Sequence, residues 1–123
     1  MIQIINYSFI SIYLKYLLIY FFRRKKRLHK IIVIRQNKLN KSPTQLYFII
    51  KTPFLSEEAL LRQVKKIREQ SDRAHIIVIG KNLPYEMFFK HHCRIFGIVD
   101  TSQYHRLTSI KNQVHFYLEG IYD

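Results

Sequence analysis

Cysteine, glycine and proline are scarce in this chain of 123 residues, and each scarcity excludes a class of protein. The one cysteine, Cys93, has no partner within the chain for a disulfide, which excludes a disulfide-stabilised scaffold and is typical of a reducing compartment. Three glycines and three prolines are too few for a collagen-like chain or a flexible linker. Because 48% of the residues are hydrophobic, a chain of this length buries a core of its own. We therefore expect a single folded domain over residues 1–123.

Acidic residues are missing from the first half of the chain. Residues 1–56 contain no Asp or Glu, yet they hold 11 of the 21 Lys and Arg residues. Residues 57–123 carry 10 basic residues against 8 acidic ones, so the net charge of +13 comes almost entirely from the first half. A partner that this charge attracts is therefore expected to contact residues 1–56.

Six basic residues lie close together after the first hydrophobic run, and we name them the basic cluster: Arg23, Arg24, Lys25, Lys26, Arg27 and Lys30. Three interpretations are open, namely a solvated surface, binding to anionic lipids of the cytoplasmic leaflet, and binding to nucleic acid. Nucleic acid is the least favoured, because no helix-turn-helix, zinc-finger or RNA-recognition signature accompanies the cluster. Lipid is favoured over nucleic acid because a hydrophobic segment adjoins it.

Residues 2–22 are mostly apolar, and two interpretations compete for them. A transmembrane helix needs about 20 apolar residues, and the basic cluster behind this run would hold the remainder in the cytoplasm. Lys15 opposes this interpretation, because a lysine near the centre of a bilayer costs about 3 kcal/mol. The alternative is a short strand over residues 2–5 and a very apolar core helix over residues 8–29. A cleavable signal peptide is not expected, since the charges follow the apolar run.

Beyond residue 30, short apolar runs alternate with helical patterns. Strands are expected over residues 31–35, 44–51, 74–80 and 96–99, and helices after Ser56, from Pro84 to about Cys93, and over residues 104–122. This alternation predicts an α/β fold with a parallel sheet and helices on both faces. The connection between residues 35 and 44 is too short for a crossover helix. Those two strands are therefore either not parallel neighbours, or they have lost a helix between them.

Three later segments resemble one family. QLYFIIK (45–51), KKIREQSDRAHIIVIG (65–80) and FFKHHCRIFGIVDT (88–101) resemble successive segments of the receiver domain of LytTR-type response regulators, the ComE/AgrA-like group of peptide-pheromone systems. The resemblance implies a flavodoxin-like receiver fold, with residues 44–123 as the receiver-like part. Together with the helix-free connection, it implies one degenerate receiver-like domain over residues 1–123 that lacks one crossover helix.

The same resemblance implies that the reactive residues of a receiver are replaced here. The aspartate that accepts the phosphoryl group falls on Ile50, and the acidic pair that binds Mg²⁺ falls on Asn6 and Tyr7. The Thr or Ser position falls on Gly80, and the Lys position falls on Thr101 or its neighbour Asp100. An aspartyl phosphate needs a carboxylate nucleophile, and Mg²⁺ prefers carboxylate oxygens. We therefore expect no phosphorylation, no enzymatic activity, no metal and no cofactor.

Receivers commonly pair through their fourth helix, fifth strand and fifth helix. The resemblance assigns the corresponding partner face to five residues: Phe88, Phe89, Lys90, Tyr104 and Arg106. It implies a cytoplasmic, non-phosphorylatable protein that contacts a response regulator or a histidine kinase in quorum-sensing or bacteriocin regulation. Two alternatives stay open. One is a small membrane-associated protein anchored by residues 2–22 at the inner face of the cell membrane, and the other is a non-functional regulator remnant.

His91, His92 and Cys93 have the composition of a metal site but not its spacing. Consecutive residues of a helix point in different directions, so their side chains do not easily share one metal ion. We expect two surface histidines beside a packed thiol.

Overall fold

A computed structural model describes residues 1–35, 38–102 and 106–122 of the chain. Its elements follow in the order β1 (Ile2–Ile5), α1 (Phe9–Arg24), β2 (Ile31–Ile34), β3 (Leu46–Lys51), α2 (Glu57–Gln70), β4 (His75–Gly80), α3 (Tyr85–Lys90), β5 (Gly97–Asp100) and α4 (Leu107–Tyr122). Their types and order are those that the sequence predicts.

The strands form one five-stranded sheet in the order β2-β1-β3-β4-β5, and every neighbouring pair is parallel. This is the strand order of flavodoxin-like folds. The prediction of an α/β fold with a parallel sheet of this kind is therefore confirmed. The strand order also answers the question left by the short connection, because β2 and β3 both pair with β1 and are not neighbours. The described part of that connection, residues 35 and 38–45, contains no helix.

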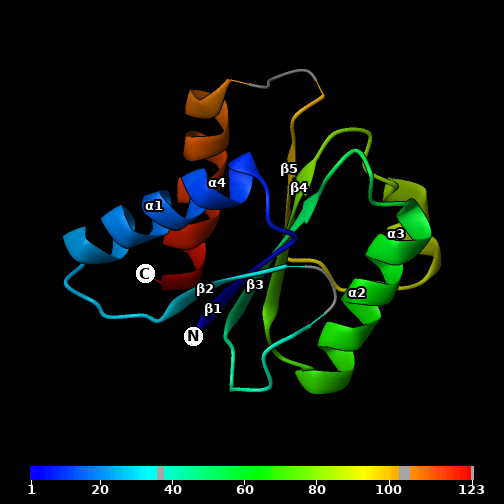
Figure 1. Ribbon diagram of the computed structural model, residues 1–123, viewed down its shortest axis with the longest axis horizontal. Helices are drawn as coiled ribbons and strands as arrows, with labels where there is room; N and C mark the ends of the chain where they lie inside the picture. Colours follow the sequence, from blue (N-terminus) through cyan, green and yellow to red (C-terminus); the bar gives the residue numbers. More distant parts are fainter. Residues whose placement is uncertain (36–37, 103–105, 123) are drawn as a thin grey trace.

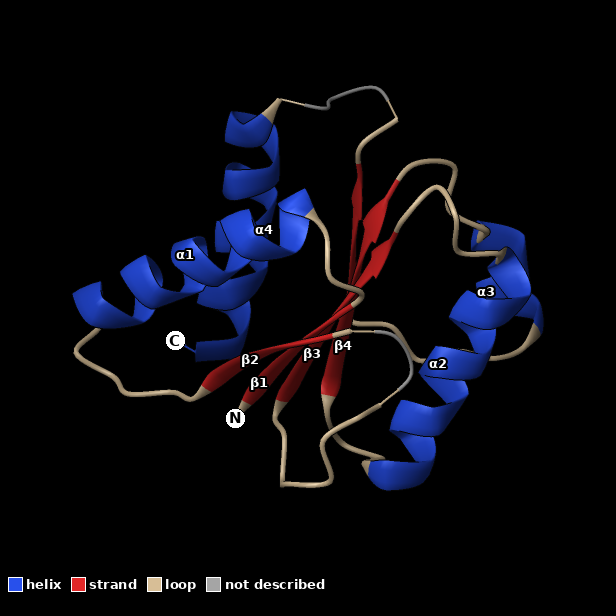
Figure 2. Cartoon of the chain, in the orientation of Figure 1, coloured by secondary structure: helices blue, strands red, loops and turns tan. Residues whose placement is uncertain are grey.

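Helices cover both faces of the sheet, as Figures 1 and 2 show. Helices α1 and α4 pack on one face, and α2 and α3 pack on the other. The strands supply alternate side chains to the two cores. Phe48 and Ile50 of β3 lie in the α1–α4 core, whereas Tyr47 and Ile49 lie in the α2–α3 core. Because both faces are covered, β3 and β4 are apolar along most of their length, and only Lys51 at the end of β3 and His75 at the start of β4 are polar.

Helix α1 is part of the core. Ser8 caps its first turn through a capping box with Ser11, and Leu14, Leu18 and Phe21 pack into the α1–α4 core. Residues 2–22 thus supply an interior strand and most of a packed helix, which is the arrangement of the core-helix alternative. Among the described residues, no helix has both the length and the apolar character that a membrane crossing requires.

Two helices end earlier than the sequence predicts, and both end in the same way. Helix α1 stops at Arg24 instead of residue 29, because Lys26 adopts a left-handed conformation with φ of 55°. The Arg27 N–H then donates to the Phe22 carbonyl at 3.0 Å, and the Lys26 N–H donates to the Arg23 carbonyl at 3.2 Å. These two bonds form a Schellman motif, in which glycine usually takes the left-handed position.

Helix α3 ends with the same motif at Lys90 instead of about Cys93. His92 has a φ of 52°, and the Cys93 N–H donates to the Phe88 carbonyl at 2.9 Å. His92 therefore terminates a helix. Burial raises the pKa of the half-buried Cys93 thiol. Within the part of the chain that the structure describes, no group of three or more His, Cys, Asp or Glu residues is arranged to hold a metal ion.

Candidate functional site

The carboxyl ends of β1 and β3 border the candidate site. From β1 the chain crosses through α1 on one face of the sheet, and from β3 it crosses through α2 on the other face. In doubly wound folds, this reversal of direction opens a crevice where ligands bind. A cavity of about 650 Å³ lies here, lined by Asn6, Tyr7, Arg35, Thr52, Phe54, Leu55 and Gln63. Its lining contains no carboxylate, and its one formal charge is the Arg35 guanidinium, which lies 4.8 Å from the centroid of the Tyr7 ring.

Two buried amides face each other at the floor of this site. The Asn6 Nδ2 donates to the Gln63 Oε1 at 3.0 Å, and the Gln63 Nε2 donates back to the Asn6 Oδ1 at 2.9 Å. The Asn6 Nδ2 also donates to the Ile50 carbonyl at 2.9 Å. Asn6 has a left-handed φ of 77°, which Asn tolerates better than most residues. This amide pair ties the ends of β1 and β3 to α2 without any charge.

Sequence reasoning missed Gln63, although the sequence carries a signal for it. Leu60, Val64 and Ile67 form the apolar face of α2, and Gln63 lies on that same face. A polar residue among core positions needs a hydrogen-bonding partner. The signal does not say which residue supplies the partner, because Asn6 lies 57 positions away.

Ile50 and Gly80 occupy positions where the resemblance expects reactive oxygens. The Ile50 side chain is buried in the α1–α4 core, so only its carbonyl belongs to the candidate site. A Cβ added at Gly80 would lie 2.8 Å from the Lys51 Cβ and 2.9 Å from the Lys51 carbonyl oxygen. A Thr or Ser side chain therefore does not fit at Gly80 unless β3 and β4 move apart.

The structure places all five substituted positions at the carboxyl edge of the sheet. Asn6 and Tyr7 line the cavity, and Ile50 contacts Asn6 through its carbonyl. Thr101 is buried, and its N–H donates to the Gly80 carbonyl at 2.9 Å. The resemblance thus predicts which strand ends lie at one edge, while the five positions themselves carry no carboxylate.

A second polar cluster follows β4 and β5 at the same edge, and sequence reasoning did not identify Tyr85 as part of it. The Tyr85 hydroxyl donates to the Asp100 Oδ2, and the Ser102 N–H donates to the Asp100 Oδ1 at 2.8 Å. Burial, together with Asp100, raises the pKa of Tyr85 to about 12. The hydrogen bond from Tyr85 is the main reason that the pKa of Asp100 is lowered. A neutral phenol bound to a carboxylate holds the start of α3 against β5 and is not a base at neutral pH.

Only some residues of the expected partner face are exposed. Phe88 is 5% exposed and packs into the α2–α3 core, so its assignment to this face is wrong. Phe89 is 87% exposed, and Lys90 and Arg106 are also exposed. Tyr104 lies outside the described residues. Helix α3 is six residues long, and so short a helix gives no repeated apolar pattern from which to tell the buried Phe from the exposed one.

The basic cluster lies at the end of α1 and in the loop that follows. Five of its six members are exposed: Arg23, Arg24, Lys26, Arg27 and Lys30. Lys25 is half-buried and forms an ion pair of 3.1 Å with Glu119 of α4. The Arg24 guanidinium lies 5.8 Å from the centroid of the Tyr20 ring, so the cluster is continuous with the outer side of α1.

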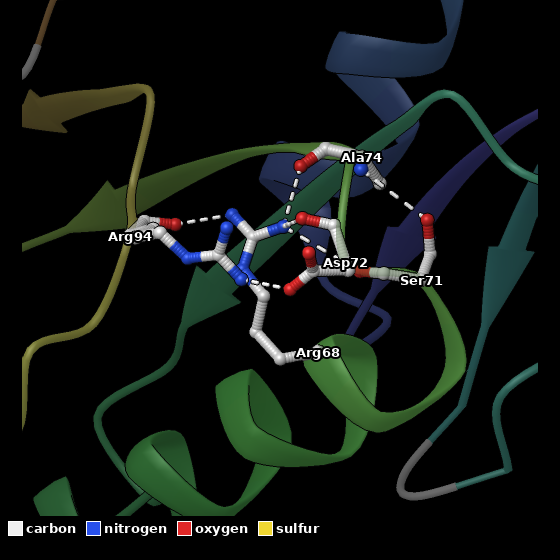
Figure 3. A network of polar contacts seen from close by, with 5 residues as sticks. All are labelled: Arg68, Ser71, Asp72, Ala74 and Arg94. Carbon is white, nitrogen blue, oxygen red and sulfur yellow. Dashed lines mark hydrogen bonds and ion pairs between the residues drawn. The ribbon is translucent and has the colours of Figure 1, made fainter.

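Arg68 joins three segments at the opposite, amino-terminal edge of β4 and β5 (Figure 3). Its guanidinium donates to the carbonyls of Ala74 at 2.7 Å and Asp72 at 3.2 Å, and to that of Arg94. The Arg94 guanidinium in turn forms an ion pair with the Asp72 carboxylate. This network fastens the end of α2 to the turn before β4 and to the loop before β5. Its hydrogen bonds satisfy main-chain carbonyls, and we assign it a structural role.

Comparison with known proteins adds no family to these observations. No family model matches the chain, and no curated protein matches it. Function therefore has to be argued from the strand order, the carboxyl-end site and the exposed surfaces.

Proposed function

We propose that this chain is a non-phosphorylatable, receiver-like protein that acts by binding a response regulator or a histidine kinase of a peptide-pheromone or bacteriocin circuit. The observation that carries the proposal is the Asn6–Gln63 amide pair, which closes the carboxyl end of a flavodoxin-like sheet. The resemblance assigns the phosphorylation site of a receiver to this end of the sheet. Aspartyl phosphate chemistry needs a carboxylate there, and Ile50 supplies none. A chain without that chemistry acts through its surfaces.

The proposed contact is centred on the exposed end of α3. Phe89 presents almost its whole ring to solvent, and Lys90 adds a charge beside it. Large exposed aromatic side chains of this kind supply much of the binding energy at protein interfaces. Arg106 is also exposed, but it precedes α4, which packs on the opposite face of the sheet, so the proposed contact is centred on Phe89 and Lys90. The regulator and the cytoplasmic part of the kinase both lie in the cytoplasm, and we place this chain there with them.

The edge of strand β5 is covered, so we do not expect a partner to bind by adding a strand to the sheet. Strand β5 ends the sheet, and the Tyr117 hydroxyl accepts from the Ile98 N–H at 3.1 Å and donates to the Ile98 carbonyl at 3.0 Å. Gly97 makes room for this cover, since a Cβ there would lie 2.4 Å from the Tyr117 ring. A partner strand added to β5 would have to displace Tyr117. Binding through α3 avoids that cost.

Isothermal titration with defined partners tests the proposal. The purified chain is titrated with the intact LytTR-type regulator of the same cell, and separately with the cytoplasmic part of its kinase. We expect a complex at micromolar concentration, and we expect Phe89→Asp to weaken it by roughly tenfold or more. Leu28→Asp is the matched control, because Leu28 is equally exposed but lies next to α1. No complex with either partner, or equal losses for both variants, would overturn the proposal.

A further inference from the structure

Helix α1 is apolar on its outer face as well as on its core face. Phe9, Ile12, Tyr16 and Tyr20 follow one another at intervals of three and four residues, so they form one stripe along the helix. All four are exposed, with Phe9 at 71% and Tyr16 at 68%. Leu14 and Leu18, on the opposite side, are fully buried. A helix on the surface of a water-soluble protein normally carries polar side chains where this stripe lies.

The stripe leads directly into the basic cluster. Arg24 lies over the Tyr20 ring, and the five exposed basic side chains follow at the end of the helix. Leu28, in the middle of the cluster, is fully exposed to solvent. Helix α1 contains no acidic residue, and residues 1–56 contain none either. This surface therefore combines exposed aromatic rings with positive charges, and no acidic side chain of residues 1–56 offsets them.

The turn after α1 has a lysine at a position where glycine would fit the backbone better. Lys26 occupies the left-handed position of the Schellman motif, where glycine has no steric penalty. The lysine side chain is exposed. The backbone of Lys26 is therefore strained, while its side chain adds charge to the surface and does not pack in the core.

We propose that the outer face of α1 and the basic cluster bind the headgroup region of an anionic lipid bilayer, with the helix lying parallel to the membrane plane. Tyrosine and phenylalanine suit this region because their rings are apolar and the tyrosine hydroxyl stays hydrated. Exposed Lys and Arg side chains are attracted to anionic headgroups. A helix of 16 residues, about 24 Å long, presents the whole stripe along the surface and does not need to cross the bilayer.

The apolar stripe favours an anionic lipid bilayer over nucleic acid as the partner of this surface. Duplex phosphates are bound by basic side chains alone, and aromatic rings add to nucleic-acid binding only by stacking on unpaired bases. The exposed aliphatic side chains of Ile12 and Leu28 do not stack on bases, but they are buried at a bilayer interface. At a bilayer the two features act together, because the rings enter the interface while the bases meet the headgroups. This inference is independent of the proposed contact through α3, which lies on the other face of the sheet.

Vesicle flotation tests the inference with the purified full chain. We expect it to float with vesicles of phosphatidylglycerol and phosphatidylcholine, and to bind pure phosphatidylcholine vesicles at least about tenfold more weakly. Tyr16→Asp should weaken binding by roughly tenfold, because it puts a negative charge in the stripe. Lys26→Gly should weaken it by roughly fivefold, the effect of one basic residue near the surface. That second variant relieves backbone strain, so misfolding does not account for its loss of binding.

Phe89→Asp is the matched control and should bind vesicles like the wild type, which separates this surface from the partner face. Failure to float with anionic vesicles would overturn the inference, as would equal binding to neutral and anionic vesicles. Binding to duplex DNA or RNA without binding to vesicles would overturn it in favour of nucleic acid. Loss of regulator binding in Tyr16→Asp, without any vesicle binding, would assign the stripe to a protein partner instead.

Discussion

Asn6 places its amide nitrogen between two oxygens, the Ile50 carbonyl and the Gln63 Oε1. The resemblance to receivers assigns an acid to this position, so Asn6→Asp tests whether the site accommodates one. We expect this substitution to lower the free energy of unfolding at pH 7 by roughly 3 kcal/mol, because a buried carboxylate would face two acceptors. Urea denaturation of wild type and variant measures the difference. Asn6→Gly, which accepts the left-handed φ and adds no charge, is the control.

The destabilisation by Asn6→Asp should depend on pH. The two oxygens disfavour the ionised carboxylate, so its pKa in the folded state lies above the ordinary value of about 3.9. At about pH 3 and below, the carboxyl is mostly protonated in both folded and unfolded states, and the loss of stability is smallest. As pH rises from there towards the raised pKa, the folded state holds the proton more tightly and the loss grows. Asn6→Gly should show no such dependence, and an equal loss at pH 3 and pH 7 would contradict the explanation.

Helix ends show where this sequence limits prediction. Capping by Ser56 and the acidic first turn of α2 are readable from the residues, and both are present. The ends of α1 and α3 are not readable, because Lys26 and His92 take left-handed positions that usually signal themselves by glycine. All three glycines lie elsewhere, in β4, β5 and α4. Apolar periodicity therefore predicts the elements and their order, while the loops and helix ends depend on contacts that periodicity does not carry.

The candidate site, too, is predicted only in part. The resemblance predicts that Asn6, Ile50, Gly80 and Thr101 meet at one edge, because strand ends in a parallel sheet meet there. It does not predict that Gln63 of α2 pairs with Asn6, since that contact depends on how the helix packs on the sheet. Nor does it predict the cover of β5 by Tyr117, which joins a helix to a strand edge through one hydroxyl.

Replacement of Lys26 by glycine should stabilise the end of α1. Lys26→Gly removes the steric penalty of a side chain at φ of 55°, and we expect the free energy of unfolding to rise by about 1 kcal/mol. Arg24→Gly also removes one positive charge, but it puts glycine inside the helix. We expect it to lower the free energy of unfolding by about 1 kcal/mol. Thermal denaturation of both variants measures the contrast. A loss of stability in Lys26→Gly would mean that its side chain makes a contact that outweighs the strain.

Charge is unevenly distributed over the whole molecule. The acid-free residues 1–56 form β1, α1, β2 and β3, so the excess of positive charge belongs to the part of the fold built around α1 and the β2 edge. Helix α2, on the opposite face, begins with Glu57 and Glu58 and has a mixed surface. Self-repulsion within the basic part lowers the stability of the compact state. The same field attracts an anionic surface to the side of the molecule that carries the stripe.

Salt should therefore have opposite effects on folding and on membrane binding. The Debye length falls from about 30 Å at 0.01 M to about 8 Å at 0.15 M, so sodium chloride screens repulsion across the whole molecule. We expect the melting temperature to rise by a few degrees over this range, as differential scanning calorimetry would measure. A variant with Arg23→Gln and Arg27→Gln should show a smaller rise, and a melting temperature that falls with salt would contradict self-repulsion. Because salt stabilises the fold, release from anionic vesicles by salt would report broken headgroup contacts and not unfolding.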